Sequence, residues 1–319
     1  MANPIDPQEV WLLELYSSGA YFERIAANLD AALDIAEDAL EAFCSKLAPD
    51  YRNTPLSEQV DIVWGERVLP NFRTTADAIH EGLQRLQSGD PEGLGFASNM
   101  RSAYAAYGRD YGSDWMSAPA ITSRRPHAAD EFEAALAAAN RAALNAASTY
   151  HAWWDVASLR GALAPDRDVS SVPVQLPSYR RMDDVQVTTG DLIPRTGIYV
   201  PAAENAAAQF LIEGRAAPKA ASGYDEERQA PRQRLDSRWT LIVRDETEQA
   251  VPPGSASSSQ AQRLEAYAGQ PCPRTGWWRT VARLGDRRHV ERGKPMPDIQ
   301  SRTHGVIIWY FDDDQRDTP

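Results

Sequence analysis

His151 and Asp155 are the residues whose types and spacing most directly indicate chemistry. Four residues apart on a predicted helix, an imidazole and a carboxylate lie one turn apart and could form a ligand pair or a proton relay. On a helix that also carries Trp153 and Trp154, such a pair more often makes a structural hydrogen bond. We therefore interpret the pair as structural.

Other patterns give less support for catalysis. The five histidines are scattered without the spacing of a His and Cys metal site, and phosphate-binding, dinucleotide-binding and nucleophile-elbow motifs are missing. The consecutive aspartates at 312–314 could act as an acid/base pair, but we interpret them as a solvated tail. The sequence therefore predicts a non-enzymatic protein with no catalytic residue, metal or cofactor. A hydrolase that uses His151 with Asp155, or the terminal aspartates, is the alternative.

An acidic stripe is the clearest indication of a binding surface in the first half of the chain. Five acids on a predicted helix are spaced 4, 3, 1 and 3 residues apart, which places them in a band of about 100° beside its apolar seam. Such a band could bind a cationic protein by charge complementarity, and an ordinary solvated helix face is the alternative. The five residues are Asp30, Asp34, Glu37, Asp38 and Glu41.

An internal repeat gives a second candidate surface. Residues 194–218 and 273–297 align at a constant offset of 79, with 7 of 25 positions identical. Each copy begins with Pro-Arg-Thr-Gly, in which the proline fixes φ and the glycine permits a positive φ. The sequence therefore predicts a sharp turn into a strand in each copy, made by Pro194 and Gly197 and by Pro273 and Gly276.

The residue pair after each turn should place one side chain inward and one outward, because side chains alternate along a strand. We favour aromatic core plugs at these positions. The alternative is a partner-binding hot spot in which an outward Tyr199 lies beside Arg195, or an outward Trp278 beside Arg274.

Basic residues gather in the second copy and could hold a nucleic-acid strand. Acids interleave with them, however, so contact with an acidic helical surface or with a second copy of the chain is the better interpretation. The basic residues are Arg279, Arg283, Arg287, Arg288, Arg292 and Lys294.

Composition limits the compartment and the partners. The 319-residue chain has a net charge of -12, and residues 1–180 contribute 25 acids against 14 bases. Such a surface repels nucleic acid and anionic membranes and attracts basic partners. Cys44 and Cys272 are too few for a disulfide framework, and we expect no signal peptide or membrane span. We therefore expect a cytoplasmic protein that binds neither nucleic acid nor membranes.

The elements that position these residues indicate an α+β fold. Apolar spacing predicts an N-terminal α-helical bundle over 1–165. Its helices are expected to begin at Pro7, to follow Ser18-Gly19 as far as Pro49, to run from about 54 to 88 with a break or kink at Pro70, and to cover about 100–107 and 126–163. A linker is expected at 166–180. A β-rich domain built from the two related repeats follows over 181–319, with strands rich in β-branched and aromatic residues.

The second copy resembles a known family. The segment Cys272–Trp278, the Arg287–His289 triplet, Gly293, the Met296–Pro297 pair and Gly305–Tyr310 together resemble the C-terminal region of the immunity protein 71 and 72 families of polymorphic-toxin and type VI secretion loci. The resemblance covers about the last 130 residues.

The resemblance implies a cytoplasmic antidote that binds a cognate toxin and blocks its active site. A cationic toxin would suit the acidic helices, and a homodimer is possible. A secretion-system adaptor that binds an effector without neutralising it is the main alternative, and a glycan-binding module is a further one.

Overall fold

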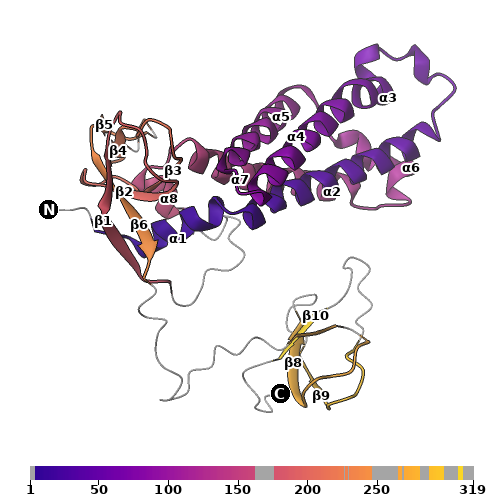
Figure 1. Ribbon diagram of the computed structural model, residues 1–319. Coiled ribbons are helices and arrows are strands. Elements are labelled where there is room, and N and C mark those ends of the chain that lie inside the picture. Colours follow the sequence, from indigo (N-terminus) through magenta and orange to yellow (C-terminus); the bar gives the residue numbers. More distant parts are fainter. Residues whose placement is uncertain are drawn as a thin grey trace. The chain divides into compact units, whose positions relative to one another are not determined.

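The computed structural model combines N-terminal helices with C-terminal antiparallel sheets, an α+β organisation (Figure 1). The chain divides into two compact units, Met1–Ala250 and Val251–Pro319. The first sheet packs with the helices of the first unit, and most of the linker expected at 166–180 lies outside the described residues. The residues that the structure describes are 4–161, 176–225, 227–228, 230–245, 265–267, 269–280, 287–297 and 308–311.

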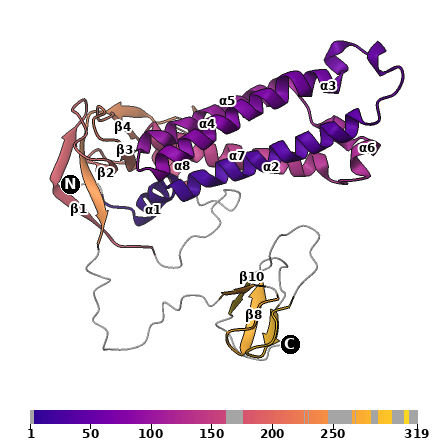
Figure 2. The same ribbon diagram turned by 45° about the vertical axis from the view of Figure 1, so that its right-hand side comes forward.

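Four long helices lie side by side in the first unit (Figures 1 and 2). They are α2 (Gly19–Cys44), α4 (Leu69–Gln87), α5 (Ala97–Asp110) and α7 (Ala128–Tyr150). Shorter helices join or flank them, namely α1 (Pro7–Tyr16), α3 (Val60–Val63), α6 (Pro119–Thr122) and α8 (Val156–Gly161). Asp6 is the N-terminal cap of α1, because its carboxylate accepts the backbone N–H of Gln8 at 3.0 Å.

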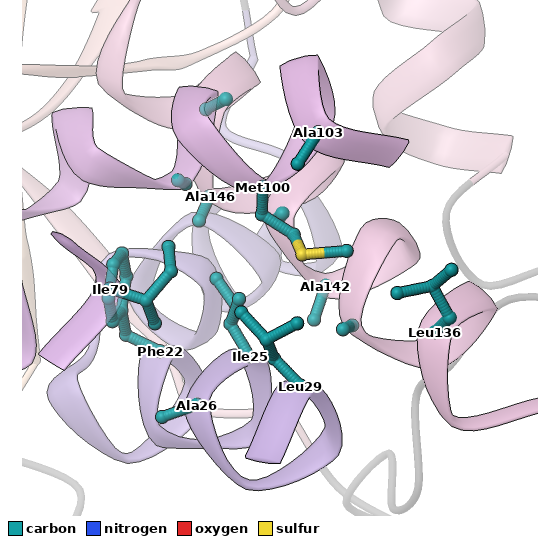
Figure 3. Packing of buried hydrophobic residues seen from close by; sticks show 14 of the residues in the cluster. Phe22, Ile25, Ala26, Leu29, Ile79, Met100, Ala103, Leu136, Ala142 and Ala146 are labelled. Atoms are coloured by element: carbon teal, nitrogen blue, oxygen red, sulfur yellow. The ribbon is translucent and has the colours of Figure 1, made fainter. Parts of the chain in front are cut away.

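The core of the first unit forms where α2 packs along α7. Phe22, Ile25 and Leu29 of the predicted seam are buried and meet residues of α4, α5 and α7 (Figure 3). The contact face of α7 consists largely of alanines, which let the two helix backbones approach closely. The buried alanines of α7 include Ala139, Ala142, Ala143, Ala146 and Ala147.

Two helix predictions need correction. The break or kink expected at Pro70 does not end the helix, because residues 60–63 and 64–68 are helical and lead directly into α4, in whose first turn Pro70 lies. A π-helical turn at Trp64–Val68 precedes it. The single helix expected over 126–163 is two helices, α7 and α8, separated by a turn at 151–155.

Two glycines allow α4 to contact the 3₁₀ turns at Pro91–Phe96. A Cβ on Gly82 would lie 2.7 Å from the Phe96 Cβ and 2.8 Å from the Gly93 carbonyl oxygen. A Cβ on Gly93 would lie 2.4 Å from the Gly82 carbonyl oxygen. Backbone atoms at such distances cannot move aside as a flexible side chain can, so the contact depends on glycine at both positions.

The first sheet, called sheet 1 here, lies at one end of the long helices (Figure 1). Its strands are antiparallel neighbours in the order β1-β6-β2-β3. Ile198, Val200 and Ile242 on one face are buried in the same core as the helices, while Tyr199 and Leu241 on the other face form a separate core. The strands are β1 (Tyr179–Thr188), β2 (Gly197–Pro201), β3 (Gln209–Leu211) and β6 (Arg238–Arg244), and β4 (Ala220–Ser222) pairs with β5 (Gln233–Leu235) nearby.

The second unit contains sheet 2, whose antiparallel order is β7-β10-β8-β9. The pairing of β8 with β9 repeats that of β2 with β3 at the offset of 79, because Tyr199 pairs with Gln209 and Trp278 pairs with Arg288. The buried face carries Trp278 and Trp309. The strands are β7 (Glu265–Tyr267), β8 (Gly276–Thr280), β9 (Arg287–Val290) and β10 (Ile308–Phe311).

The same backbone hydrogen bonds recur at matched positions of the two sheets. Gly214 N–H donates to the Ile193 carbonyl at 2.9 Å, and Gly293 N–H donates to the Cys272 carbonyl at 2.8 Å. Both glycines adopt a positive φ, 79° for Gly214 and 84° for Gly293. In addition, Thr196 and Thr275 accept the N–H of the residue 17 positions later, at 3.0 and 2.8 Å.

Replacing Gly82 with alanine tests the close contact of α4. We expect Gly82→Ala to destabilise the protein by about 1–3 kcal/mol, because the added methyl overpacks the contact. The matched control is Gly108, an exposed helical residue at which an added Cβ would meet nothing within 4 Å. Gly108→Ala should be stabilising by up to about 1 kcal/mol. Urea unfolding of both variants measures the difference, and equal effects would contradict this account.

Candidate functional site

The two aromatic residues that follow the repeated turns are the core plugs that we favoured. Tyr199 and Trp278 are both fully buried, so the hot-spot alternative is wrong for them. The Tyr199 hydroxyl donates to the Arg195 carbonyl at 2.7 Å, and the Trp278 indole N–H donates to the Arg274 carbonyl at 3.1 Å. Each ring therefore fixes the turn that precedes it.

The arginines of the two turns remain at the surface. Arg195 and Arg274 are exposed, and the Arg274 guanidinium lies 4.7 Å from the ring centre of Phe311. Pro194 and Pro273 are exposed in bends that lead into β2 and β8. Gly276 has a φ of 154°.

Position 197 has no room for a side chain larger than that of glycine. A Cβ there would lie 2.6 Å from a methyl group of Leu241 on the neighbouring strand, where Leu241 is buried. Gly197 is not among the residues with a positive φ. Its role is therefore a close approach between strands, and the positive φ that the motif suggested is found only in the second copy.

The acidic stripe on α2 is only partly available to a partner. Asp30 lies 3.1 Å from His80, and Glu37 accepts a hydrogen bond from Arg73 at 2.7 Å, so these two acids join α2 to α4. The three other acids of the stripe are exposed in the structure, namely Asp34, Asp38 and Glu41.

His151 and Asp155 do not form a dyad. Asp155 is buried and caps α8, because its carboxylate accepts the backbone N–H groups of Ala157 and Ser158, both at 2.9 Å. His151 instead lies 3.5 Å from the Ser98 hydroxyl and stacks on Trp153. Asp155 therefore has a structural role, as the N-terminal cap of α8.

The turn after α7 separates two adjacent tryptophans. Trp154 is buried, stacks on Tyr16 and donates to the Thr149 hydroxyl at 3.0 Å. Trp153 is 52% exposed. Ala152 between His151 and Trp153 adopts a φ of 53°, which is unusual for a residue with a Cβ and turns Trp153 outward.

Trp153 and its neighbours form a candidate contact surface, called the Trp153 surface here. The Trp153 ring stacks on His151 with the ring centres 4.2 Å apart, and Tyr150 meets the edge of His151 at 4.8 Å. Next to them is a shallow cavity of about 550 Å³, lined by Arg85, Glu92, Gly95, Phe96, Ser98, Asn99, Tyr150 and His151. Exposed tryptophan, tyrosine and arginine together are typical of the centres of protein interfaces.

A polar network at the Trp153 surface joins the helices to the turn that follows β3. Arg215 donates from Nε to the Glu92 carboxylate at 3.0 Å and forms a second, shorter bond through a terminal nitrogen. Its guanidinium lies 4.2 Å from the ring centre of Tyr150, whose hydroxyl also donates to Glu92 at 2.8 Å. The Glu92 carboxylate thus holds both Arg215 and Tyr150, and Tyr150 is part of the Trp153 surface.

The network also sets protonation states. Burial alone would raise the pKa of Glu92, but the hydrogen bonds from Arg215 and Tyr150 and the charge of Arg215 lower the pKa below its usual value. Partial burial, with the charges of Arg215 and Arg101, lowers the pKa of His151. His151 is therefore a neutral aromatic ring at pH 7, which suits stacking on Trp153.

A second group of aromatic and basic side chains lies on sheet 2, where Trp277 and Arg287 are half-buried and His289 is exposed. The Arg287 guanidinium lies 4.5 Å from the ring centre of Trp277, and His289 meets the edge of the same ring at 5.5 Å. Arg288 lies on the opposite side, 6.0 Å from the ring centre of Trp309. The sequence identified this basic group, but Arg283 and the side chain of Arg279 are outside the described residues.

Other expectations also lie outside the described residues, including those for the aspartates at 312–314 and for the histidine at 304. In the described part, three or more acidic, histidine or cysteine side chains are nowhere grouped to hold a metal ion. No described helix is both long enough and apolar enough to cross a bilayer. Comparison with protein families, with curated proteins and with solved structures finds no match to this chain.

The buried hydroxyl of Tyr199 provides a test of the plug. Tyr199→Phe removes one hydrogen bond to a carbonyl and should lower the free energy of unfolding by about 1 kcal/mol. Denaturant unfolding measures this loss. An unchanged stability would mean that the hydroxyl does not hold the turn.

Acid should weaken the Glu92 network. A carboxylate with a lowered pKa in the folded state stabilises the protein above its unfolded-state pKa of about 4.3, and this contribution is lost as pH falls through the folded-state pKa. Glu92→Gln should therefore destabilise the protein at pH 7 and lose that difference from wild type in acid. The exposed Glu213 is the control, and Glu213→Gln should leave the pH profile of unfolding unchanged. If the difference in the free energy of unfolding between Glu92→Gln and wild type does not change with pH, the assignment is contradicted.

Proposed function

We propose that this chain is a cytoplasmic immunity protein that binds a cognate toxin and blocks the toxin's active site. The resemblance of the second repeat to the immunity protein 71 and 72 families suggests this role. The structural observation that carries it is the Trp153 surface, where a tryptophan that is 52% exposed is held outward by a strained turn. A side chain of this type, held rigid before binding, loses little entropy when a partner covers it.

We also infer that the chain consists of a helical bundle and two copies of one β repeat. The equal strand order, the matched pairing at the offset of 79 and the matched plug hydrogen bonds support the repeat. The shared core of α2, α4, α5 and α7 supports the bundle. A rigid scaffold of this kind favours binding by a preformed surface.

The partner is proposed to be a protein with a cationic surface. Asp34, Asp38 and Glu41 are exposed along one side of α2 and add to the negative field of the first half of the chain. Such a field accelerates association with a basic protein, including a nuclease whose active-site cleft binds phosphates. We expect these acids to raise the rate of association more than the final affinity.

Co-expression tests the proposal directly. The protein should suppress the toxicity of the effector encoded beside its gene and should capture that effector in a pull-down. Capture without rescue would instead identify an adaptor, since an adaptor leaves the toxin active. Failure to capture the effector would reject both roles.

Truncation of Trp153 tests the contact surface. Trp153→Ala should weaken effector binding by about 2 kcal/mol, or roughly thirtyfold, because a rigid aromatic anchor is lost. Leu56 is 69% exposed on the 3₁₀ turn Leu56–Glu58, and Leu56→Ala is the matched control. Titration calorimetry of purified proteins measures both affinities. Equal affinities for the two variants would remove the Trp153 surface from the contact.

A further inference from the structure

A small cavity lies at the end of the long helices away from sheet 1, next to α3 (Figures 1 and 2). Its volume is about 160 Å³. Three aromatic side chains and one carboxylate contribute to its lining, namely Trp64, Tyr111, Trp115 and Glu58. Aromatic rings together with a carboxylate are the groups that bind an ammonium or guanidinium ion in water. We call this site the Glu58 cavity.

Two indole rings form adjacent walls of the Glu58 cavity. The ring centres of Trp64 and Trp115 are 5.1 Å apart, and their planes are inclined by 64°. Trp64 is buried and begins the π-helical turn Trp64–Val68, while Trp115 and Tyr111 are half-buried. A π-helical turn is rare and is often found at functional sites. The rings are therefore held in place before any ligand arrives.

The Glu58 carboxylate has no cation of its own. Glu58 is exposed, and its side chain joins no ion pair or hydrogen bond within the described residues. Arg52 is already engaged, since it donates to the Gln59 side chain at 2.7 Å and to the Asp61 carboxylate at 2.5 Å. Arg67 lines the next cavity along the helices and is exposed. A cation from outside would therefore meet an uncompensated negative charge.

Hydrogen bonds hold the turn that carries Glu58. Gln59 is buried, and its side chain donates to the Thr54 carbonyl at 2.8 Å and accepts from Arg52. Arg52 in turn is held by Asp61 at the start of α3. The backbone is thus fixed on both sides of the Leu56–Glu58 turn. A carboxylate on a fixed backbone loses less conformational entropy when it binds a ligand.

Cavities along α4 and α5 connect the Glu58 cavity with the Trp153 surface. The Glu58 cavity shares Tyr111 with a cavity of about 230 Å³, which shares Asn71 with one of about 290 Å³. That third cavity shares Asn99 with the cavity beside Trp153. About 20 Å of chain along α5 separates Asn99 from Tyr111, because a helix rises about 1.5 Å per residue. The two sites therefore lie on one face, within the reach of a single protein interface.

We propose that the Glu58 cavity binds a lysine or arginine side chain of the partner protein. The ammonium or guanidinium group pairs with the Glu58 carboxylate, and the apolar part of the side chain lies against Tyr111 and Trp115. The identity of the partner rests on the proposed function, whereas the cation chemistry of the cavity does not. The cationic partner thereby gains a specific contact in addition to its attraction to the acidic stripe of α2.

The test uses the full chain and short synthetic peptides. Each probe is a capped peptide of alanines with a single central lysine or arginine. In the control peptides, norleucine replaces lysine and citrulline replaces arginine, which removes the charge and nearly keeps the shape. Nuclear magnetic resonance titration of the tryptophan indole N–H signals should show saturable binding with a Kd on the order of 1 mM for at least one charged peptide. The neutral peptides should bind about tenfold more weakly.

Substitution of Glu58 locates the contact. Glu58→Gln should weaken binding of the charged peptide about fivefold, because the ion pair is lost from a partly open site. Glu58→Lys places a competing cation at the cavity and should abolish binding. Glu213 is an exposed residue of the first unit, and Glu213→Gln should leave the affinity unchanged. Leu56 is not among the residues that line the cavity, so Leu56→Ala should also have no effect. Circular dichroism checks that each variant is folded.

Several results would overturn the proposal. These are no binding of either charged peptide by wild type, equal binding of charged and neutral peptides, or equal affinities for Glu58→Gln and Glu213→Gln. n-Butylammonium is a lysine side chain without the peptide. If it binds about tenfold more tightly than the lysine peptide, the cavity selects a free amine and the proposal fails.

The proposed function is separable from this inference. Peptide binding that is retained while the effector is not captured would reject the immunity role alone. Effector capture and rescue that are unaffected by Glu58→Lys would reject this contact alone. Both proposals predict that Glu58→Lys weakens effector capture, which a pull-down at matched protein concentrations measures.

Discussion

The β part of this protein depends on the alternation of side chains along a strand. In each copy of the repeat, one hydrogen bond fixes which side chains face the core. In each copy a buried ring donates to a carbonyl four residues earlier, from Tyr199 to Arg195 and from Trp278 to Arg274. With that ring buried, its neighbour must point to the opposite face. The plug therefore decides which chemistry the other face can present.

Outside the strands, too, one of two adjacent aromatic residues is buried and the other is exposed. After α7, Trp154 is held inside by its bond to Thr149, and Gln209 of sheet 1 donates to the Trp154 carbonyl at 2.6 Å. Trp153 is left exposed and stacks on His151. The exposed tryptophan is thus a consequence of how firmly the helices and sheet 1 hold the residue beside it.

Polar contacts between the helices and sheet 1 determine the shape of this end of the first unit. Glu92 binds Arg215, and Glu14 binds both Tyr179, at 2.8 Å, and Arg244. Partly exposed pairs of this kind add little stability one by one, because water screens them. Their value lies in direction, because the Glu14 contacts hold β1 and β6 against α1 and the Glu92 contact holds the turn after β3 against the 3₁₀ turns at Pro91–Phe96. The apolar core supplies most of the free energy.

Local chemistry in the sequence determined the fold class and the matched turns, because these depend on residues close together in the chain. Tertiary structure decided that Trp278 and Trp154 are buried, whereas Trp277 is half-buried and Trp153 is exposed. It also placed Asp30 and Glu37 beside His80 and Arg73 of α4. It also gave Asp155 a capping role and joined sheet 1 to the helices within one unit. Burial and ion pairing depend on groups far apart in sequence, and periodicity cannot specify which of two faces meets a neighbour. A pair such as Trp153-Trp154 signals that one ring will be exposed, but only the packing of the whole unit chooses which one.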